Sequence, residues 1–135
     1  MSSSTKLLRT FRHAPTPFSP RLFSTSARRA VHYLNADKDI FDKVTSSSDR
    51  VAIVDFYADW CGPCRTLSPI LERLTPDESN LDLVTINTDE QIHLAAQFKV
   101  SALPTVIAFK HGKPIKQFVG ALPEPQVRKF FDSLN

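Results

Sequence analysis

The sequence predicts an α/β fold with a central mixed β-sheet flanked by helices on both faces. Apolar runs typical of buried strands alternate with segments whose apolar residues recur at helical spacing, which indicates parallel strands joined by helices. Near the C-terminus two strand-like runs are separated only by the turn HGK, which indicates a hairpin and therefore an antiparallel pair. A content of 41% apolar and 23% charged residues is typical of a globular chain.

The elements are expected in the order β-α-β-α-β-α-β-β-α. The strand-like runs are rich in β-branched and aromatic residues and lie at 31–34, 51–58, 81–87, 105–110 and 114–119. The run VAIVDFYA at 51–58 is nearly continuous in apolar residues, as in a strand buried on both faces. Asp55 is its one charged residue, and a carboxyl group at such a position is conspicuous.

The helices are predicted from helical spacing and from capping residues. Asn35 is expected to cap the first helix, whose apolar stripe is Ile40, Phe41 and Val44. The second covers 65–74 and contains Pro69, which should kink it. The third covers 90–98 after a cap at Thr88 or Asp89. Its buried side is expected to hold Ile92, Ala95, Ala96 and Phe98. The fourth covers 124–134, and its buried face is expected to hold Val127, Phe130, Phe131 and Leu134.

The charge of the chain is unevenly distributed. Residues 1–30 carry +6 with no acid, and residues 31–135 carry −3, which together give the net charge of +3. The folded part is therefore mildly acidic, and nucleic-acid binding by it has no electrostatic support. No apolar run approaches the roughly 18 residues that a membrane span needs, so membrane insertion is not expected.

Residues 1–30 have the composition of an organelle transit peptide, rich in Ser, Thr and Arg and without acid. The segment TKLLRTFRHA can form a short amphipathic helix. We predict a cleaved mitochondrial presequence at 1–30 and one folded domain at 31–135, with import into the matrix. The stretch RLFSTSARRAV resembles a two-step cleavage pattern that starts the mature chain at Val31, and a single cut that starts it at Ser24 is an alternative. A plastid is the competing organelle, and a basic tail that binds anionic surfaces is the alternative to import.

The two cysteines of the chain, Cys61 and Cys64, lie where a buried strand ends and a helix begins. The N-terminus of a helix favours negative charge, which lowers the pKa of a thiol there and increases its thiolate fraction. Three residues on, Cys64 faces the same side and can reach Cys61, so the pair can exchange disulfides with a partner. A zinc site would need further ligands that the chain does not place nearby. Two incidental buried thiols are the other alternative, and a disulfide that closes so short a loop would stabilise little.

Four short motifs carry a resemblance to a known family. They are VDF at 54–56, WCGPC at 60–64, LPT at 103–105 and FVGA at 118–121. Together they resemble thioredoxin from about Val31 to the C-terminus, and with the presequence the chain resembles the mitochondrial members. The resemblance implies the thioredoxin fold and a protein-disulfide reductase that contributes to mitochondrial redox homeostasis. It implies no bound cofactor and no metal, only the Cys61–Cys64 dithiol, with NADPH acting indirectly through thioredoxin reductase. The implied partners are that reductase and disulfide-containing proteins such as peroxiredoxins, and the implied state is a monomer.

The resemblance also assigns roles to residues. Cys61 is the exposed nucleophile, Cys64 the buried resolving thiol, and Asp55 the buried acid that exchanges a proton with Cys64. Pro104 matches a cis-proline beside the cysteines. The implied substrate-docking surface consists of Trp60, Gly62, Pro63, Leu103, Pro104, Gly120 and Ala121. Taken alone, Asp55 is also consistent with a structural carboxylate, Trp60 with core packing and Gly120 with the end of a strand.

Two departures from the family pattern concern Asp55. Tyr57 stands where the family often has Trp, and Thr85 is placed beside Asp55 where many members carry Lys. Without that cation, Asp55 lacks a charge partner. An oxidase or isomerase is the rival with the same chemistry, but such domains usually have His at the position of Pro63. The alternative function from another class is that of a binding module, which serves as a subunit of a complex.

Overall fold

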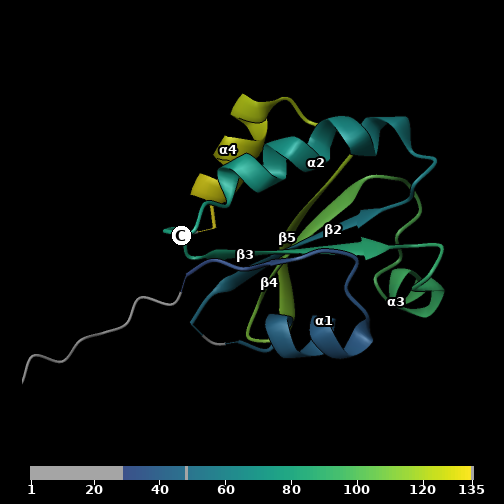
Figure 1. Ribbon diagram of the computed structural model, residues 1–135, viewed down its shortest axis with the longest axis horizontal. Helices are drawn as coiled ribbons and strands as arrows, with labels where there is room; N and C mark the ends of the chain where they lie inside the picture. Colours follow the sequence, from purple (N-terminus) through teal and green to yellow (C-terminus); the bar gives the residue numbers. More distant parts are fainter. Residues whose placement is uncertain (1–28, 48, 135) are drawn as a thin grey trace, which may run out of the picture.

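The computed structural model describes residues 29–47 and 49–134, and Figure 1 shows a sheet between two layers of helices. The presequence predicted at 1–30, with its amphipathic helix, lies outside the described residues except for Arg29 and Ala30. The described elements follow the predicted order. They are β1 His32–Tyr33, α1 Lys38–Thr45, β2 Val51–Tyr57, α2 Gly62–Leu74, β3 Leu81–Asn87, α3 Ile92–Gln97, β4 Thr105–Lys110, β5 Lys113–Val119 and α4 Glu124–Asp132.

The sheet is mixed, as predicted, and its strand order is β1-β3-β2-β4-β5. β1 and β2 pair with β3 in parallel, whereas β4 pairs antiparallel with β2 and β5. β2 is the central strand, and its residues are buried up to Phe56, which explains its nearly continuous apolar sequence. β5 is an edge strand with mostly exposed residues, and its alternating sequence fits that place.

Each face of the sheet has its own hydrophobic core. α1 and α3 cover one face and α2 and α4 the other, as the two helix layers in Figure 1 show. On the first face Phe41 packs edge-on against Phe109. On the second, Leu67 and Leu71 of α2 meet Val127 of α4, all three fully buried. The predicted buried face of α4 is confirmed. In the described part of the chain no helix is long and apolar enough to cross a membrane.

The predicted N-cap of the first helix was wrong. The N-cap of α1 is Asp37, whose carboxylate accepts a hydrogen bond from the Ile40 amide at 2.9 Å. Asn35 instead has a φ of 50° and donates its backbone N–H to the Thr85 hydroxyl at 2.8 Å. The helix therefore begins at Lys38, two residues later than a cap at Asn35 would allow. Ile40, predicted in the apolar stripe, is 37% exposed.

The third helix also differs from the prediction. It begins at Ile92 after Gln91, which makes no capping hydrogen bond through its side chain. The predicted caps are engaged elsewhere, since Thr88 donates to the Tyr57 carbonyl and Asp89 accepts from the Trp60 indole. The resulting helix buries Leu94 and Ala95 and leaves Ile92 and Ala96 exposed, while Phe98 is partly buried against the core. Tertiary hydrogen bonds therefore decided where this helix starts.

A buried ion pair joins the start of β2 to the start of β3. Arg50 Nε donates to Asp82 Oδ1 at 2.8 Å, with side-chain exposures of 5% and 9%. The same carboxylate oxygen accepts the Val31 backbone N–H at 3.0 Å. Because β2 and β3 are parallel, this cluster lies at the end of the sheet opposite to the end of β2 that leads to the cysteines. It holds the residues before β1 against the fold.

Candidate active site

The two cysteines form a disulfide between the end of β2 and the start of α2. The S–S distance is 2.17 Å, and the Cα atoms of Cys61 and Cys64 are 5.4 Å apart. Cys61 is the N-cap of α2, and its sulfur accepts the Cys64 backbone N–H at 3.3 Å. The sulfur therefore lies at the positive end of the helix, where a thiolate is favoured when the bond is reduced. The predicted reach of one cysteine to the other is confirmed.

Cys61 is not exposed, contrary to the expectation. Its exposed fraction is 4%, against 2% for Cys64. The pair packs with Ala58 and against the partly buried side chains of Tyr57 and Leu103. In the disulfide form these neighbours cover both residues, so the two sulfurs differ by their place in the helix more than by their accessible area. A partner must therefore approach Cys61 closely to reach it.

Asp55 is fully buried in the middle of β2. It lies on the face of the strand that α2 covers, because Ile53, two residues earlier, packs in the same core as Leu67. Burial raises the pKa of the Asp55 carboxyl from 3.8 to about 7, and Ser68 lowers it by hydrogen bonding to a smaller extent. Neither carboxyl oxygen has a hydrogen-bond partner of good geometry in the described chain. A carboxyl group with such a pKa can take up or release a proton near neutral pH.

The predicted register of Thr85 beside Asp55 is confirmed, since the two residues are paired between β2 and β3. On the other side Asp55 is paired with Val106 of β4. The Thr85 hydroxyl is already bound by the Asn35 amide, and Thr85 carries no charge. Tyr57, the second departure, is half-buried two residues along the same strand. Neither β-strand neighbour supplies a cation to Asp55, so burial dominates its titration.

The loop before β4 lies against the disulfide. The Leu103–Pro104 peptide bond is cis, as the resemblance implied, and Leu103 packs against the cysteine pair. The Gly120 amide donates to the Pro104 carbonyl at 2.8 Å, which brings the end of β5 to the same place. The φ of Gly120 is 92°, a conformation that favours glycine. Leu103, Pro104 and Gly120 therefore lie together, and Leu103 of this group contacts the cysteine pair.

The rest of the predicted docking surface is solvent-accessible. Gly62, Pro63 and Ala121 are exposed. Trp60 is 70% exposed, which rules out core packing as its role, and its indole N–H donates to Asp89 Oδ2 at 3.0 Å. An exposed large aromatic side chain that is held by a hydrogen bond is typical of a docking surface.

Sequence reasoning missed Ser68. It lies in α2 one turn after Cys64, and its hydroxyl donates to the Cys64 carbonyl at 3.0 Å. The spacing of four residues from a cysteine on a predicted helix could have identified it, because such residues share a helix face. Its effect on Asp55 depends on how α2 lies over β2, which the spacing does not indicate.

The structure gives no support to the zinc alternative. In the described ranges no three His, Cys, Asp or Glu side chains are grouped so that they could hold a metal ion, so the zinc alternative lacks a ligand set there.

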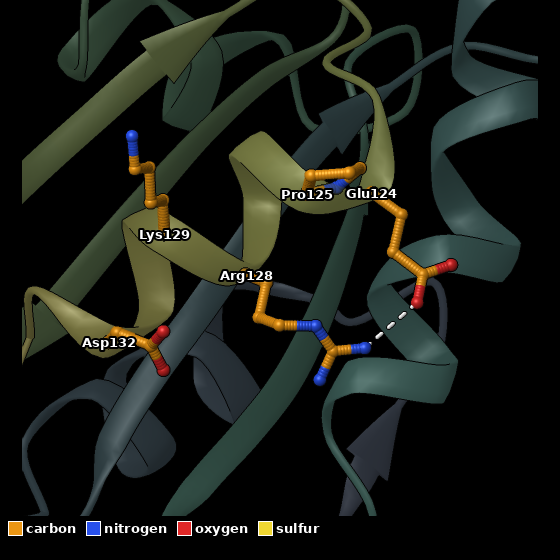
Figure 2. A pocket seen from close by; sticks show the side chains of 5 residues that line it. All are labelled: Glu124, Pro125, Arg128, Lys129 and Asp132. Atoms are coloured by element: carbon orange, nitrogen blue, oxygen red, sulfur yellow. Dashed lines mark hydrogen bonds and ion pairs between the residues drawn. The ribbon is translucent and has the colours of Figure 1, made fainter.

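A surface hollow of about 480 Å³ lies on α4 and is lined by Glu124, Pro125, Arg128, Lys129 and Asp132 (Figure 2). Glu124 is bound there by Arg73 and by Arg128, which lower the pKa of its carboxyl. The cysteines do not line this hollow, so it is a charged helix surface apart from the disulfide.

Comparison with known proteins agrees with the resemblance to thioredoxin over most of the chain. Residues 31–133 match the family model described as Thioredoxin. Thioredoxin 2 of Chlorobaculum tepidum is 40% identical over 101 residues, which cover 74% of this chain and 93% of that protein. A chloroplastic thioredoxin Y of Oryza sativa is 37% identical over 117 residues, covering 84% of this chain and 70% of that one. A mutant thioredoxin of Halobacterium salinarum superposes with a TM-score of 0.71 at 32% identity, covering 80% of this chain and 94% of that chain.

Proposed function

Because the chain belongs to the thioredoxin family and is a thiol–disulfide oxidoreductase, we propose that it reduces protein disulfides in mitochondria with electrons from NADPH. Its redox group is the Cys61–Cys64 disulfide. Thioredoxin reductase would return this disulfide to the dithiol, and disulfide-containing proteins such as peroxiredoxins would receive the electrons. The observation that carries the proposal is a disulfide at the N-cap of α2. The strand before it, β2, also holds a buried carboxyl group, Asp55, whose pKa is raised to about 7.

In the proposed mechanism Cys61 is the nucleophile. Its thiolate, favoured by the N-terminus of α2, attacks one sulfur of the partner's disulfide, and the partner's other sulfur leaves as a thiolate. A mixed disulfide then joins Cys61 to the partner. The position of Cys61 as the N-cap supports this role, since the Cys64 backbone N–H at the helix start donates to its sulfur. Cys61 therefore performs the step that needs a negative charge at the N-terminus of α2.

Cys64 is the resolving thiol and Asp55 its proton acceptor. Cys64 loses its proton to the Asp55 carboxylate, directly or through water, and attacks the Cys61 sulfur. The second partner sulfur leaves as a thiolate that takes up a proton, and the Cys61–Cys64 disulfide forms again. The full burial of Asp55 and its pKa of about 7 support this assignment, because the group is then close to the pH at which it must gain and lose the proton.

The partner would dock in an extended form around the disulfide. The backbone at Leu103, before the cis bond to Pro104, offers hydrogen bonds to an extended segment. Trp60, Gly62 and Pro63 would lie along one side of that segment. Gly120 and Ala121 complete the proposed surface, to which the Pro104–Gly120 hydrogen bond gives a fixed shape. A monomer leaves this surface free, and the monomeric state is part of the proposal.

The test is a coupled assay with the full chain. NADPH consumption is followed with thioredoxin reductase and insulin, beside Cys61→Ser and Cys64→Ser variants and an exposed control, Asp42→Asn. We expect turnover in the parent and the control and none in the cysteine variants. Cys64→Ser alone should accumulate a mixed disulfide with the substrate, which mass spectrometry detects. A folded parent that forms its disulfide but consumes no NADPH would refute the reductase assignment.

The organelle is a separate part of the proposal. The acid-free, Arg-rich composition of residues 1–30 supports import into the mitochondrial matrix. The similarity to a chloroplastic relative gives the plastid alternative its own support. Import of the full chain into isolated mitochondria and chloroplasts, followed by N-terminal sequencing, separates the two. We expect uptake by mitochondria and a mature start at Val31 or Ser24, and uptake by chloroplasts alone would contradict the proposal.

A further inference from the structure

Trp60 is an exposed side chain that is nevertheless bonded to another part of the chain. It is 70% exposed, and its indole N–H donates to Asp89 Oδ2 at 3.0 Å. It comes directly before Cys61, so its orientation shapes one side of the surface that a partner meets at the disulfide. An exposed hydrogen bond competes with water, and it orients a side chain only where the acceptor is itself held. The orientation of Trp60 therefore depends on what holds Asp89.

Asn87 holds the turn that carries Asp89. Asn87 is the last residue of β3, is 4% exposed and is paired with Tyr57 of β2. Its side-chain Oδ1 accepts the Asp89 backbone N–H at 3.0 Å. Its backbone carbonyl accepts the amides of Glu90 and Gln91 at 3.2 Å and 2.8 Å. The turn after β3 is thus closed on one buried residue of the sheet.

The side chain of Asn87 also reaches the segment before Trp60. Its Nδ2 donates to Asp59 Oδ2 at 3.5 Å, a longer bond than the one to the Asp89 amide. The backbone N–H of Asp89 can only donate and the ionised carboxylate of Asp59 can only accept, so these two partners define the orientation of the Asn87 amide. One buried amide therefore joins the residue before Trp60 to the residue that binds its indole.

We propose that Asn87 is a positioning residue for partner docking, which acts through Asp89 to hold the Trp60 indole in the orientation that a protein substrate meets. This inference rests on the reductase function proposed above. Asn87 is buried and does not touch the partner in this role. A Trp60 side chain that is ordered in advance loses less conformational freedom when a partner covers it, and the partner is then bound more tightly.

The alternative role of Asn87 is to end β3. An asparagine whose side chain accepts the amide two residues on forms a turn of its own, and such a turn needs no contact with another segment. In that role, loss of the side chain lowers the stability of the fold and leaves the order of Trp60 unchanged. In the proposed role Trp60 becomes mobile, and a protein substrate is affected more than a small disulfide is. These expectations separate the two roles.

Trp60 is the only tryptophan of the chain, so its indole N–H gives a single NMR signal. In the isotope-labelled, oxidised full chain, the order parameter of this N–H measures side-chain motion on the picosecond-to-nanosecond timescale. We expect about 0.85 in the parent, the value of a rigid backbone, and below about 0.6 in Asn87→Ala. Asp89→Ala removes the acceptor of the indole and should give the same low value. Asn87→Ala in the Asp89→Ala background should lower it no further.

A second measurement separates docking from thiol chemistry. With insulin as the protein substrate and thioredoxin reductase in excess, we expect Asn87→Ala to raise KM about 2- to 10-fold with kcat nearly unchanged, since ordering one side chain at an interface costs that much. Dithionitrobenzoate is a small aromatic disulfide that does not cover the docking surface. Its rate with the reduced full chain should therefore change less than about twofold in Asn87→Ala.

Two control variants lie in or beside the same strand. Val84→Ala removes part of a fully buried side chain from β3 and lowers stability without touching the turn after Asn87. Asn80→Ala replaces an exposed asparagine directly before the other end of β3. Both variants should keep the parent's order parameter and KM. If Val84→Ala mobilises Trp60 as much as Asn87→Ala does, the effect is one of general stability and the inference is refuted.

The outcomes that overturn the inference differ from those that overturn the reductase function. A mobile Trp60 in the parent, an unchanged order parameter or KM in Asn87→Ala, or an equal loss of rate with dithionitrobenzoate each refutes the positioning role. A parent that does not reduce insulin refutes the reductase function and the docking role with it, whereas the NMR measurement still decides whether Asn87 orders Trp60. An active parent and an Asn87→Ala variant with the same KM would leave the reductase standing and remove Asn87 from docking.

Discussion

Replacing Asp55 by Asn should stabilise the oxidised protein at high pH and change little at low pH. Asp55 is fully buried, and its pKa is raised from 3.8 to about 7, chiefly by burial. Between these two values the folded chain holds a proton that the unfolded chain has lost. Folding stability therefore falls as the pH rises through this window, and the loss is complete above about pH 7.

The magnitude follows from the displacement of the pKa. The interval from 3.8 to about 7 corresponds to about 4 kcal/mol, at about 1.4 kcal/mol for each pH unit. Asn has nearly the size of the neutral acid and does not ionise, so Asp55→Asn removes the pH-dependent part and keeps the packing. We expect a gain of about 4 kcal/mol at pH 8 and less than about 1 kcal/mol at pH 4. The gain in stability should accompany a slower resolving step, because the proton acceptor is lost.

Urea unfolding of the oxidised full chain, followed by circular dichroism between pH 4 and pH 8, measures the difference. Asp42→Asn is the matched control, since Asp42 is an exposed aspartate paired with Lys38 and its loss should add little pH dependence. A difference between Asp55→Asn and the parent that stays constant across this range would refute the reasoning. So would a variant that is less stable than the parent at pH 8.

Three further changes test the packing and the ends of the elements by the same urea unfolding. Asp82→Asn breaks the buried pair with Arg50 and should cost about 3–5 kcal/mol, and a loss below about 1 kcal/mol would show that water replaces the pair. Leu71→Ala, at a site with 0% exposure, should lower the free energy of unfolding by about 2–5 kcal/mol. Ile92→Ala, at 64% exposure, should change it by no more than about 0.5 kcal/mol. Equal effects of the two variants would contradict the assigned cores. Asp37→Ala removes the N-cap of α1 and should cost about 1 kcal/mol, and an unchanged stability would exclude this capping role.

The order of the elements was predictable because each signal is local. Strand and helix periodicity, together with the HGK turn, were enough for the predicted order, and the structure confirms it. The place of Cys61 at a helix start was predictable for the same reason, since a strand runs directly into WCGPC. Asp55 was noticeable from sequence because a charge interrupts an apolar run, and its burial is confirmed.

The predicted helix caps failed because capping side chains have competing partners. Asp89 is a suitable cap by residue type, but its carboxylate binds the Trp60 indole from another part of the chain. Thr88 donates to the Tyr57 carbonyl instead. Such competition depends on which segments meet in the fold, and periodicity along the chain does not contain that information.

The sequence by itself determined the sheet-and-helix order, the redox pair and the identity of the buried acid, because these follow from residue type and spacing along one segment. Tertiary structure alone decided the burial of Cys61 against Leu103 and the raised pKa of Asp55. These properties depend on how α2 and the loop before β4 lie over β2. Solvent exclusion and hydrogen-bond competition act through space between segments, so only the folded arrangement determines them.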